Sequence, residues 1–101
     1  MKKLGIMLST EPSNKNLETV IGLTKAAIKN NTAVYLYMID DGVECINDNR
    51  LIDLSKEGLK LFVCAYGAQK KGISPSDIAN FGGLAVLSEL INACDKFIAF
   101  G

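Results

Sequence analysis

Cys64 is the residue whose type and surroundings most readily suggest chemistry. An apolar run that begins at Leu61 ends at this cysteine, and the pattern from Tyr66 to Lys71 predicts a short helix. A thiol at a helix start lies near unpaired backbone N–H groups and the positive end of the helix dipole, and both favour the thiolate. Such a thiolate can attack a persulfide and hold the transferred sulfur. The residues also allow a second interpretation, in which Cys64 only fills space, because free cysteine is among the most buried residue types.

The remaining cysteines and the lack of histidine limit the kinds of reactive site that this chain can form. The chain has three cysteines, no histidine and no C-x-x-C spacing, which argues against a disulfide framework and a thioredoxin-type motif. Without histidine, a Cys–His nucleophile pair and most zinc sites are excluded. We expect a site that holds no metal and no cofactor. Cys94 is expected to pack on the apolar face of a helix. Cys45 falls in a polar stretch, where we expect an exposed loop; it is either incidental, the favoured interpretation, or a second thiol within reach of Cys64.

Local patterns predict strands and helices that alternate along the chain. Strands are expected at residues 3–9, 33–39, 60–64 and 96–100, with a short extended piece near 81–83. Helices are expected at 15–30, 51–58, 66–71, 74–80 and 84–93. This order predicts one α/β domain, residues 1–101, built on a parallel sheet with right-handed crossovers.

The carboxyl ends of parallel strands share one edge of the sheet, where the predicted site would lie. Cys64 is the expected catalytic residue, and the expected rim consists of Ser9, Thr10, Asp41, Tyr66 and Gly67. The paired acids at 40–41 could instead suggest a Mg²⁺ pocket, but turn chemistry explains Asp-Asp-Gly adequately. A phosphate or flavin site in the loop 9–14 is a weaker alternative, because that loop contains no glycine.

Composition narrows the range of partners. Eleven basic and eleven acidic residues give a net charge of zero, and no basic stripe is present for nucleic acid. No apolar run approaches the roughly 20 residues of a membrane span, and the short run after Lys3 lacks a signal-peptide cleavage site, so we expect a cytoplasmic protein.

Hydrophobic residues form 49 % of the chain, more than a small monomer easily buries. The helix at 84–93 is apolar nearly all round, and we expect a neighbouring subunit to cover its second side.

Two segments together resemble a known family. The first is Phe62-Val-Cys64 with Lys71-Gly72-Ile73; the second is Gly82-Gly-Leu84 with Leu87, Glu89 and the closing Cys94-Asp-Lys-Phe-Ile-Ala-Phe100. Their order and spacing, with Asp41-Gly42-Val43 after the second strand, resemble the DsrE-like family, which includes the DsrE/DsrF/DsrH and TusB/TusC/TusD sulfur-relay subunits. The resemblance implies a flavodoxin-like three-layer sandwich with a mainly parallel sheet of four or five strands, assembled into trimers or hexamers. It also implies that active members carry sulfur as a persulfide on one cysteine, here Cys64.

Two functions are therefore expected. In the first, Cys64 accepts sulfur from a donor protein and passes it to an acceptor protein, as a sulfurtransferase-type carrier. In the second, the chain is a non-catalytic oligomeric module that binds a partner or a small ligand at the same edge of the sheet. Both expect a homo-oligomer that binds neither nucleic acid nor membrane.

Overall fold

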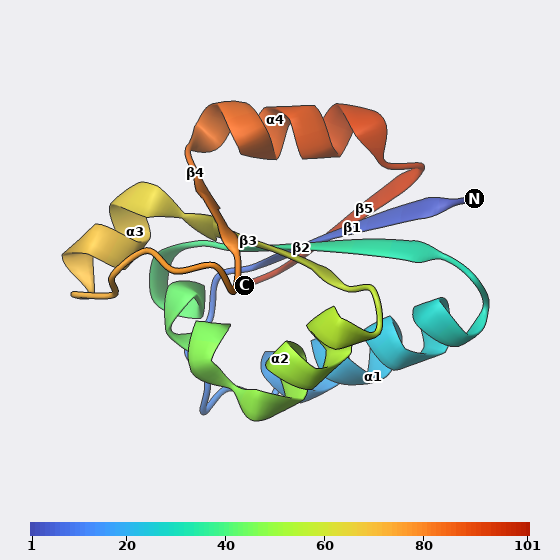
Figure 1. Cartoon of the computed structure of the whole chain (residues 1–101), viewed down its shortest axis with the longest axis horizontal. Helices are drawn as coiled ribbons and strands as arrows, with labels where there is room; N and C mark the ends of the chain where they lie inside the picture. Colours follow the sequence, from blue (N-terminus) through green and yellow to red (C-terminus); the bar gives the residue numbers. More distant parts are fainter.

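The computed structural model describes all 101 residues as an α/β fold around a five-stranded sheet (Figure 1). The strands are β1 (Lys3–Leu8), β2 (Ala33–Met38), β3 (Lys60–Cys64), β4 (Asn80–Gly82) and β5 (Lys96–Phe100). The helices are α1 (Asn16–Lys29), α2 (Asn49–Lys56), α3 (Ala65–Lys70) and α4 (Leu84–Ala93), with a 3₁₀ helix, η1 (Asp40–Asn47), after β2. All strand pairs are parallel, in the order β4-β3-β2-β1-β5, which confirms the predicted sheet.

The two faces of the sheet are covered unequally. α1 and α2 lie on one face, α4 lies on the other, and α3 lies beyond the end of β3 (Figure 1). On its side α1 buries Leu17, Val20 and Ile21, whereas the one buried residue of α4 is Leu90. Leu84 and Ile91 of α4 are 67 % and 47 % exposed, so the second side of α4 is open in the single chain. That a neighbouring subunit covers it stays a prediction.

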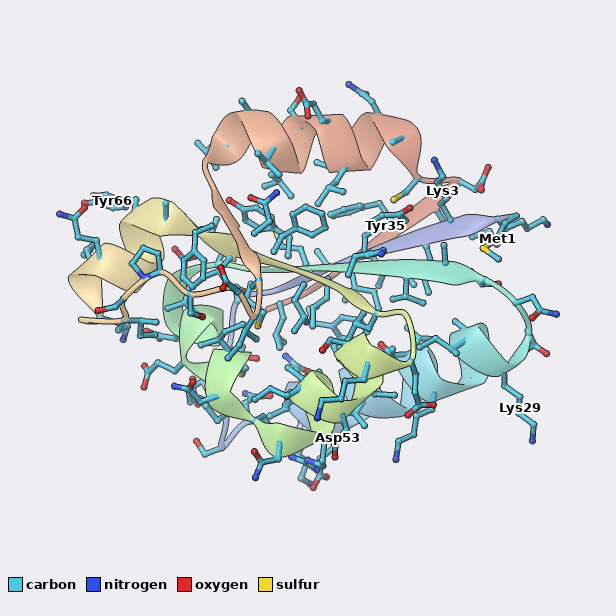
Figure 2. All side chains as sticks on the ribbon, in the orientation of Figure 1. Met1, Lys3, Lys29, Tyr35, Asp53 and Tyr66 are labelled. Carbon is cyan, nitrogen blue, oxygen red and sulfur yellow. The ribbon has the colours of Figure 1, made fainter.

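The register of β2 and β3 directs four side chains to the α4 face. Tyr37 lies opposite Phe62, and alternate residues of a strand share a face, so Tyr35, Tyr37, Phe62 and Cys64 point the same way. The rings of Tyr35 and Phe62 form a tilted pair with centroids 6.3 Å apart. Figure 2 shows Tyr35 between the sheet and α4. Cys64 therefore leaves the sheet on the less densely covered side.

The predicted helix at residues 74–80 is wrong. The structure has turns and irregular backbone from Lys71 to Ala79, and the chain then enters β4. The hydroxyl of Ser76 accepts a hydrogen bond from the backbone N–H of Ile78 at 3.4 Å. A serine side chain bonded in this way offers the backbone an alternative to the helix, so the Ser-Pro-Ser pattern marks a turn here.

The expected exposed loop around Cys45 is also wrong. This stretch belongs to η1, in which Val43, Cys45 and Ile46 are buried beneath the polar residues of the same helix. Cys45 itself is 0 % exposed. The apolar residues are too few and too closely spaced to give a clear helical period, so the sequence pattern alone predicts a loop.

None of the helices combines the length and the apolar character that crossing a membrane requires.

Candidate functional site

Cys64 lies at the junction of β3 and α3, where the sequence pattern predicts it. It is the last residue of β3 and the N-cap of α3, with extended backbone angles. Its Sγ accepts a hydrogen bond from the backbone N–H of Gly67 at 3.4 Å. This bond satisfies one of the N–H groups that a helix start leaves unpaired. The α3 helix thus holds the thiol in place through its own backbone.

A cavity of about 610 Å³ lies beside Cys64, at the carboxyl ends of β2 and β3. Small-molecule sites in proteins usually measure roughly 300–1,000 Å³. Its lining combines apolar and charged groups: Ile39, Asp40, Asp41, Cys64, Tyr66, Gly67, Lys70, Lys71, Gly83 and Leu84. Cys64 is 7 % exposed and is the one cysteine of the three that lines this cavity. Its sulfur therefore lies in the wall of the cavity and not on the open surface.

Two large side chains form an exposed apolar rim around the cavity. Tyr66 from α3 is 69 % exposed, and Leu84 from the first turn of α4 is 67 % exposed. Figure 2 shows Tyr66 pointing outward from α3. The ammonium group of Lys70 lies over the Tyr66 ring, 5.4 Å from its centroid. Exposed aromatic and aliphatic side chains beside a cavity are typical of surfaces that contact another molecule.

An ion-pair cluster joins the end of α3 to η1. The Nζ of Lys71 lies 2.7 Å from Oδ1 of Asp41 and 3.1 Å from Oε1 of Glu44. Asp41 first, and Glu44 second, raise the pKa of Lys71 above its ordinary value. No group of three or more Cys, Asp or Glu side chains gathers as a metal site. Asp41 is therefore held in an ion pair with Lys71 in the wall of the cavity.

Gly67 allows α3 and η1 to approach each other closely. A Cβ on Gly67 would lie 3.2 Å from Cγ1 of Val43, 3.6 Å from the backbone N of Asp40 and 3.7 Å from Cβ of Cys64. Asp40 itself has a φ of 53°, a conformation that aspartate adopts more readily than most residues. The absence of a side chain at Gly67 therefore permits the close approach of α3 to the start of η1.

Tyr37 is a part of the site that the sequence interpretation missed. Its buried hydroxyl donates to the carbonyl oxygens of Gly82 at 3.1 Å and Gly83 at 3.2 Å. Burial, followed by the charge and hydrogen bonding of neighbouring Cys64, raises the pKa of Tyr37 to about 12. The alternation of side chains along β2 and β3 could have placed Tyr37 and Cys64 on one face of the sheet. No sequence pattern, however, shows which groups the Tyr37 hydroxyl binds.

The structure brings together some of the predicted rim and not the rest. Asp41, Tyr66 and Gly67 line the cavity with Cys64. Ser9 and Thr10 do not line it. The Ser9 hydroxyl donates to the backbone oxygen of Phe100 at 3.2 Å, and the Thr10 hydroxyl accepts from the Asn16 amide at 3.2 Å. The two hydrogen bonds instead connect the end of β1 to the end of β5 and to the start of α1.

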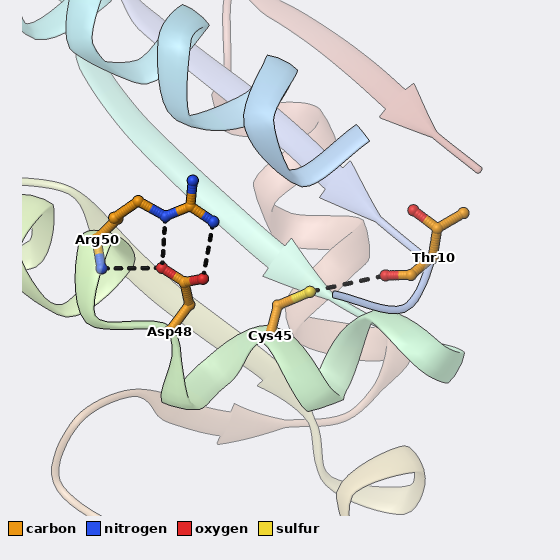
Figure 3. Close-up of polar contacts among 4 residues, drawn as sticks. All are labelled: Thr10, Cys45, Asp48 and Arg50. Carbon is orange, nitrogen blue, oxygen red and sulfur yellow. Dashed lines mark hydrogen bonds and ion pairs between the residues drawn. The ribbon is translucent and has the colours of Figure 1, made fainter. Parts of the chain in front are cut away.

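The other two thiols lie in different surroundings. The Sγ of Cys45 donates to the backbone oxygen of Thr10 at 3.7 Å (Figure 3). Burial, with smaller contributions from neighbouring acidic side chains, raises the pKa of Cys45 to about 11. Asp48, the N-cap of α2, pairs with Arg50 in the same view. Burial also raises the pKa of the partly buried Cys94. Both thiols are therefore held in their neutral form at neutral pH.

The model of the DsrE family, described as DsrE/DsrF-like, matches residues 2–100. The chain belongs to the DsrE/DsrF-like family. No curated protein matches the sequence.

Solved structures share the fold of this DsrE/DsrF-like chain. The crystal structure of the ychN protein from E. coli superposes with a TM-score of 0.87 at 20 % identity, covering 99 % of this chain and 100 % of that one. BT1422, a conserved protein of unknown function from Bacteroides thetaiotaomicron, superposes with a TM-score of 0.80 at 12 % identity, covering 98 % and 95 %. At these identities the likeness concerns the fold alone.

Proposed function

We propose that this DsrE/DsrF-like protein is a sulfur carrier in which Cys64 holds sulfane sulfur as a persulfide. The observation that carries the proposal is the position of Cys64, whose thiol caps a helix in the wall of a cavity of about 610 Å³. The family resemblance, in which active members use one cysteine at this position, supports the same residue. Cys45 and Cys94 are poorer candidates, because neither lines the cavity, and burial raises the pKa of both.

The proposed transfer needs no cofactor and no net oxidation. The Cys64 thiolate attacks the terminal sulfur of a donor persulfide, R–S–SH. A new S–S bond forms at Cys64, the donor S–S bond breaks, and the donor leaves as the thiolate R–S⁻, while the proton stays on the transferred sulfur. The reverse attack by an acceptor thiolate on the terminal sulfur regenerates the Cys64 thiolate. The protein acts as a carrier between two partners and not as a turnover enzyme.

The partners would be a donor protein and an acceptor protein that dock at the cavity rim. The exposed Tyr66 and Leu84 flank the cavity on two elements and supply apolar contact area for such docking. The open side of α4, with Ile91, supports a homo-oligomer, for which the family resemblance implies a trimer or hexamer. We place the protein in the cytoplasm, where three unpaired thiols stay reduced.

Intact mass after incubation with a protein persulfide donor tests the proposal. The wild type should gain about 32 Da, the mass of one sulfur atom, and Cys64→Ser should gain nothing. Cys94→Ser is the matched control, because it removes another thiol outside the cavity and should load like the wild type. Loading of Cys64→Ser equal to that of the wild type would refute the proposal.

A non-catalytic binding module of the same fold is the second candidate. The low exposure of Cys64, 7 %, favours it, because a thiol within the wall of a cavity can also serve only to fill space. This candidate predicts that Cys64 reacts with iodoacetamide at neutral pH no faster than an ordinary thiol. Reaction about tenfold faster or more would count against it.

A further inference from the structure

The hydroxyl of Tyr37 has one proton and more than one neighbour that can accept it. In the structure the proton is directed at the carbonyl oxygens of Gly82 and Gly83, 3.1 and 3.2 Å away. The Cys64 sulfur is a further neighbour: β3 lies between β2 and β4, so the Tyr37 side chain crosses β3 beside Cys64 to reach Gly82. In the structure the hydroxyl makes no hydrogen bond to this sulfur, although the charge of Cys64 contributes to the raised pKa of Tyr37. A phenol donates a single O–H, so these acceptors compete for it.

The sheet itself brings the competitors together. Cys64 lies opposite Gly82 in the register of β3 and β4, and Tyr37 projects from β2 on the same face. Cys64 and Gly83 both line the cavity. Tyr37 is 0 % exposed, so water does not supply a substitute donor or acceptor at this point. A charge on the sulfur would therefore act on the Tyr37 hydroxyl with little screening by water.

We propose that Tyr37 is a positioning residue for Cys64, whose hydroxyl proton turns from the Gly82 and Gly83 carbonyls to the sulfur when the sulfur becomes an anion. The inference builds on the proposed persulfide function, because the thiolate is the form that attacks the donor. Hydrogen bonds to an ionised acceptor are roughly twice as strong as bonds to a neutral one. The thiolate thus draws the proton away from the two carbonyls.

The consequence reaches the rim of the cavity. Gly82 and Gly83 form the turn between β4 and α4, and Leu84 on the rim follows directly. The turn is tight, because a Cβ on Gly82 would lie 2.6 Å from Cγ2 of Val86. Release of the two carbonyls by Tyr37 would change the hydrogen bonding of this turn. Cys64 ionisation and the position of Leu84 are then linked in both directions, because linkage is reciprocal.

Other titratable groups around the sulfur do not produce the same link. Asp40 and Asp41 face the cavity from η1, Tyr66 and Lys70 face it from α3, and Lys71 follows α3 directly; β4 and α4 contribute none. Lys71 and Asp41 are engaged with each other. Of all the titratable groups near Cys64, Tyr37 alone also contacts the Gly82–Gly83 turn.

An NMR titration of the full chain, with Cys64 alkylation measured in parallel, tests the inference. The backbone N–H groups of Gly83 and Leu84 share peptide units with the carbonyls that Tyr37 binds, so their resonances report the loss of that bond. In the wild type they should shift at the pH at which the rate of iodoacetamide alkylation, mapped to Cys64 by peptide mass, reaches half of its maximum. Cys64→Ser should abolish the shift.

Tyr37→Phe should also abolish the shift, and it should slow Cys64 alkylation at neutral pH about tenfold, as expected for the loss of one hydrogen bond to a charged acceptor. Tyr35→Phe is the matched control, because it removes a hydroxyl from the same face of β2 and should leave both readouts unchanged. The inference would be overturned if the Gly83 and Leu84 resonances of the wild type do not shift over the pH range in which Cys64 ionises. This result does not depend on whether Tyr37→Phe folds. Neither experiment uses a persulfide donor, so a failure to load sulfur would refute the proposed function and leave this coupling intact.

Discussion

Replacing Gly67 by alanine tests whether the contact between α3 and η1 is as close as the structure requires. The new Cβ would lie 3.2 Å from Cγ1 of Val43, which is 0 % exposed and has little room to move. Overpacking of this kind costs about 1–3 kcal/mol. Alanine favours the helical state over glycine by only about 0.5–1 kcal/mol. The overpacking wins, and Gly67→Ala should lower the free energy of unfolding by about 1 kcal/mol, or the melting temperature by about 4 °C.

Gly22→Ala provides the matched control. Gly22 is also helical, in α1, but a Cβ there would meet nothing within 4 Å. The same chemical change should therefore stabilise the protein by about 0.5–1 kcal/mol. Urea denaturation followed by circular dichroism measures both variants, and Val43→Ala, which removes Cγ1, should reduce the cost of Gly67→Ala. Equal stabilisation by the two glycine replacements would refute the close contact at Val43.

Three further predictions concern stability. Thr24→Val should raise the free energy of unfolding in urea by about 1 kcal/mol, because the buried Thr24 hydroxyl has no hydrogen-bond partner; a loss would contradict this. Leu90→Ala should cost about 2–4 kcal/mol, whereas Leu84→Ala, at a 67 % exposed position, should change monomer stability by less than about 0.5 kcal/mol; equal losses would contradict the packing of α4. Burial raises the pKa of Cys45 from 9.0 to about 11 and that of Tyr37 from 10.0 to about 12. Both values exceed those of the unfolded chain, so the two neutral groups contribute to the free energy of unfolding below pH 9, and this contribution is lost as the pH rises to about 12. A free energy of unfolding that stays constant from pH 9 to about 12 would contradict both shifts.

Much of the fold follows from local patterns. The apolar runs and the helical period predict β1, α1, β2, β3, α4 and β5 to within one or two residues, because each element buries a continuous stripe or face. The alternation of strands and helices then leaves a parallel sheet as the natural arrangement. The junction at Cys64 was predictable for the same reason, since the hydrophobic period changes there.

The parts that sequence patterns could not predict depend on contacts between distant segments. The buried thiol of Cys45 belongs to a 3₁₀ helix whose short period resembles a polar loop. The hydroxyl of Tyr37 reaches Gly82, 45 positions away, through a sheet order that the sequence does not state. Ser9 lies at the expected edge of the sheet, but its hydroxyl turns to Phe100 because β5 pairs with β1 on the side away from β3.

The central claim is that Cys64 is the sulfur-carrying thiol of this protein. The most direct measurement is peptide mass mapping after the wild type is incubated with a persulfide donor and the products are trapped with iodoacetamide. We expect an added sulfur atom, about 32 Da, on the peptide that contains Cys64 and none on those with Cys45 or Cys94. Sulfur found on another cysteine, or on none while the donor is active toward a known acceptor, would contradict the account.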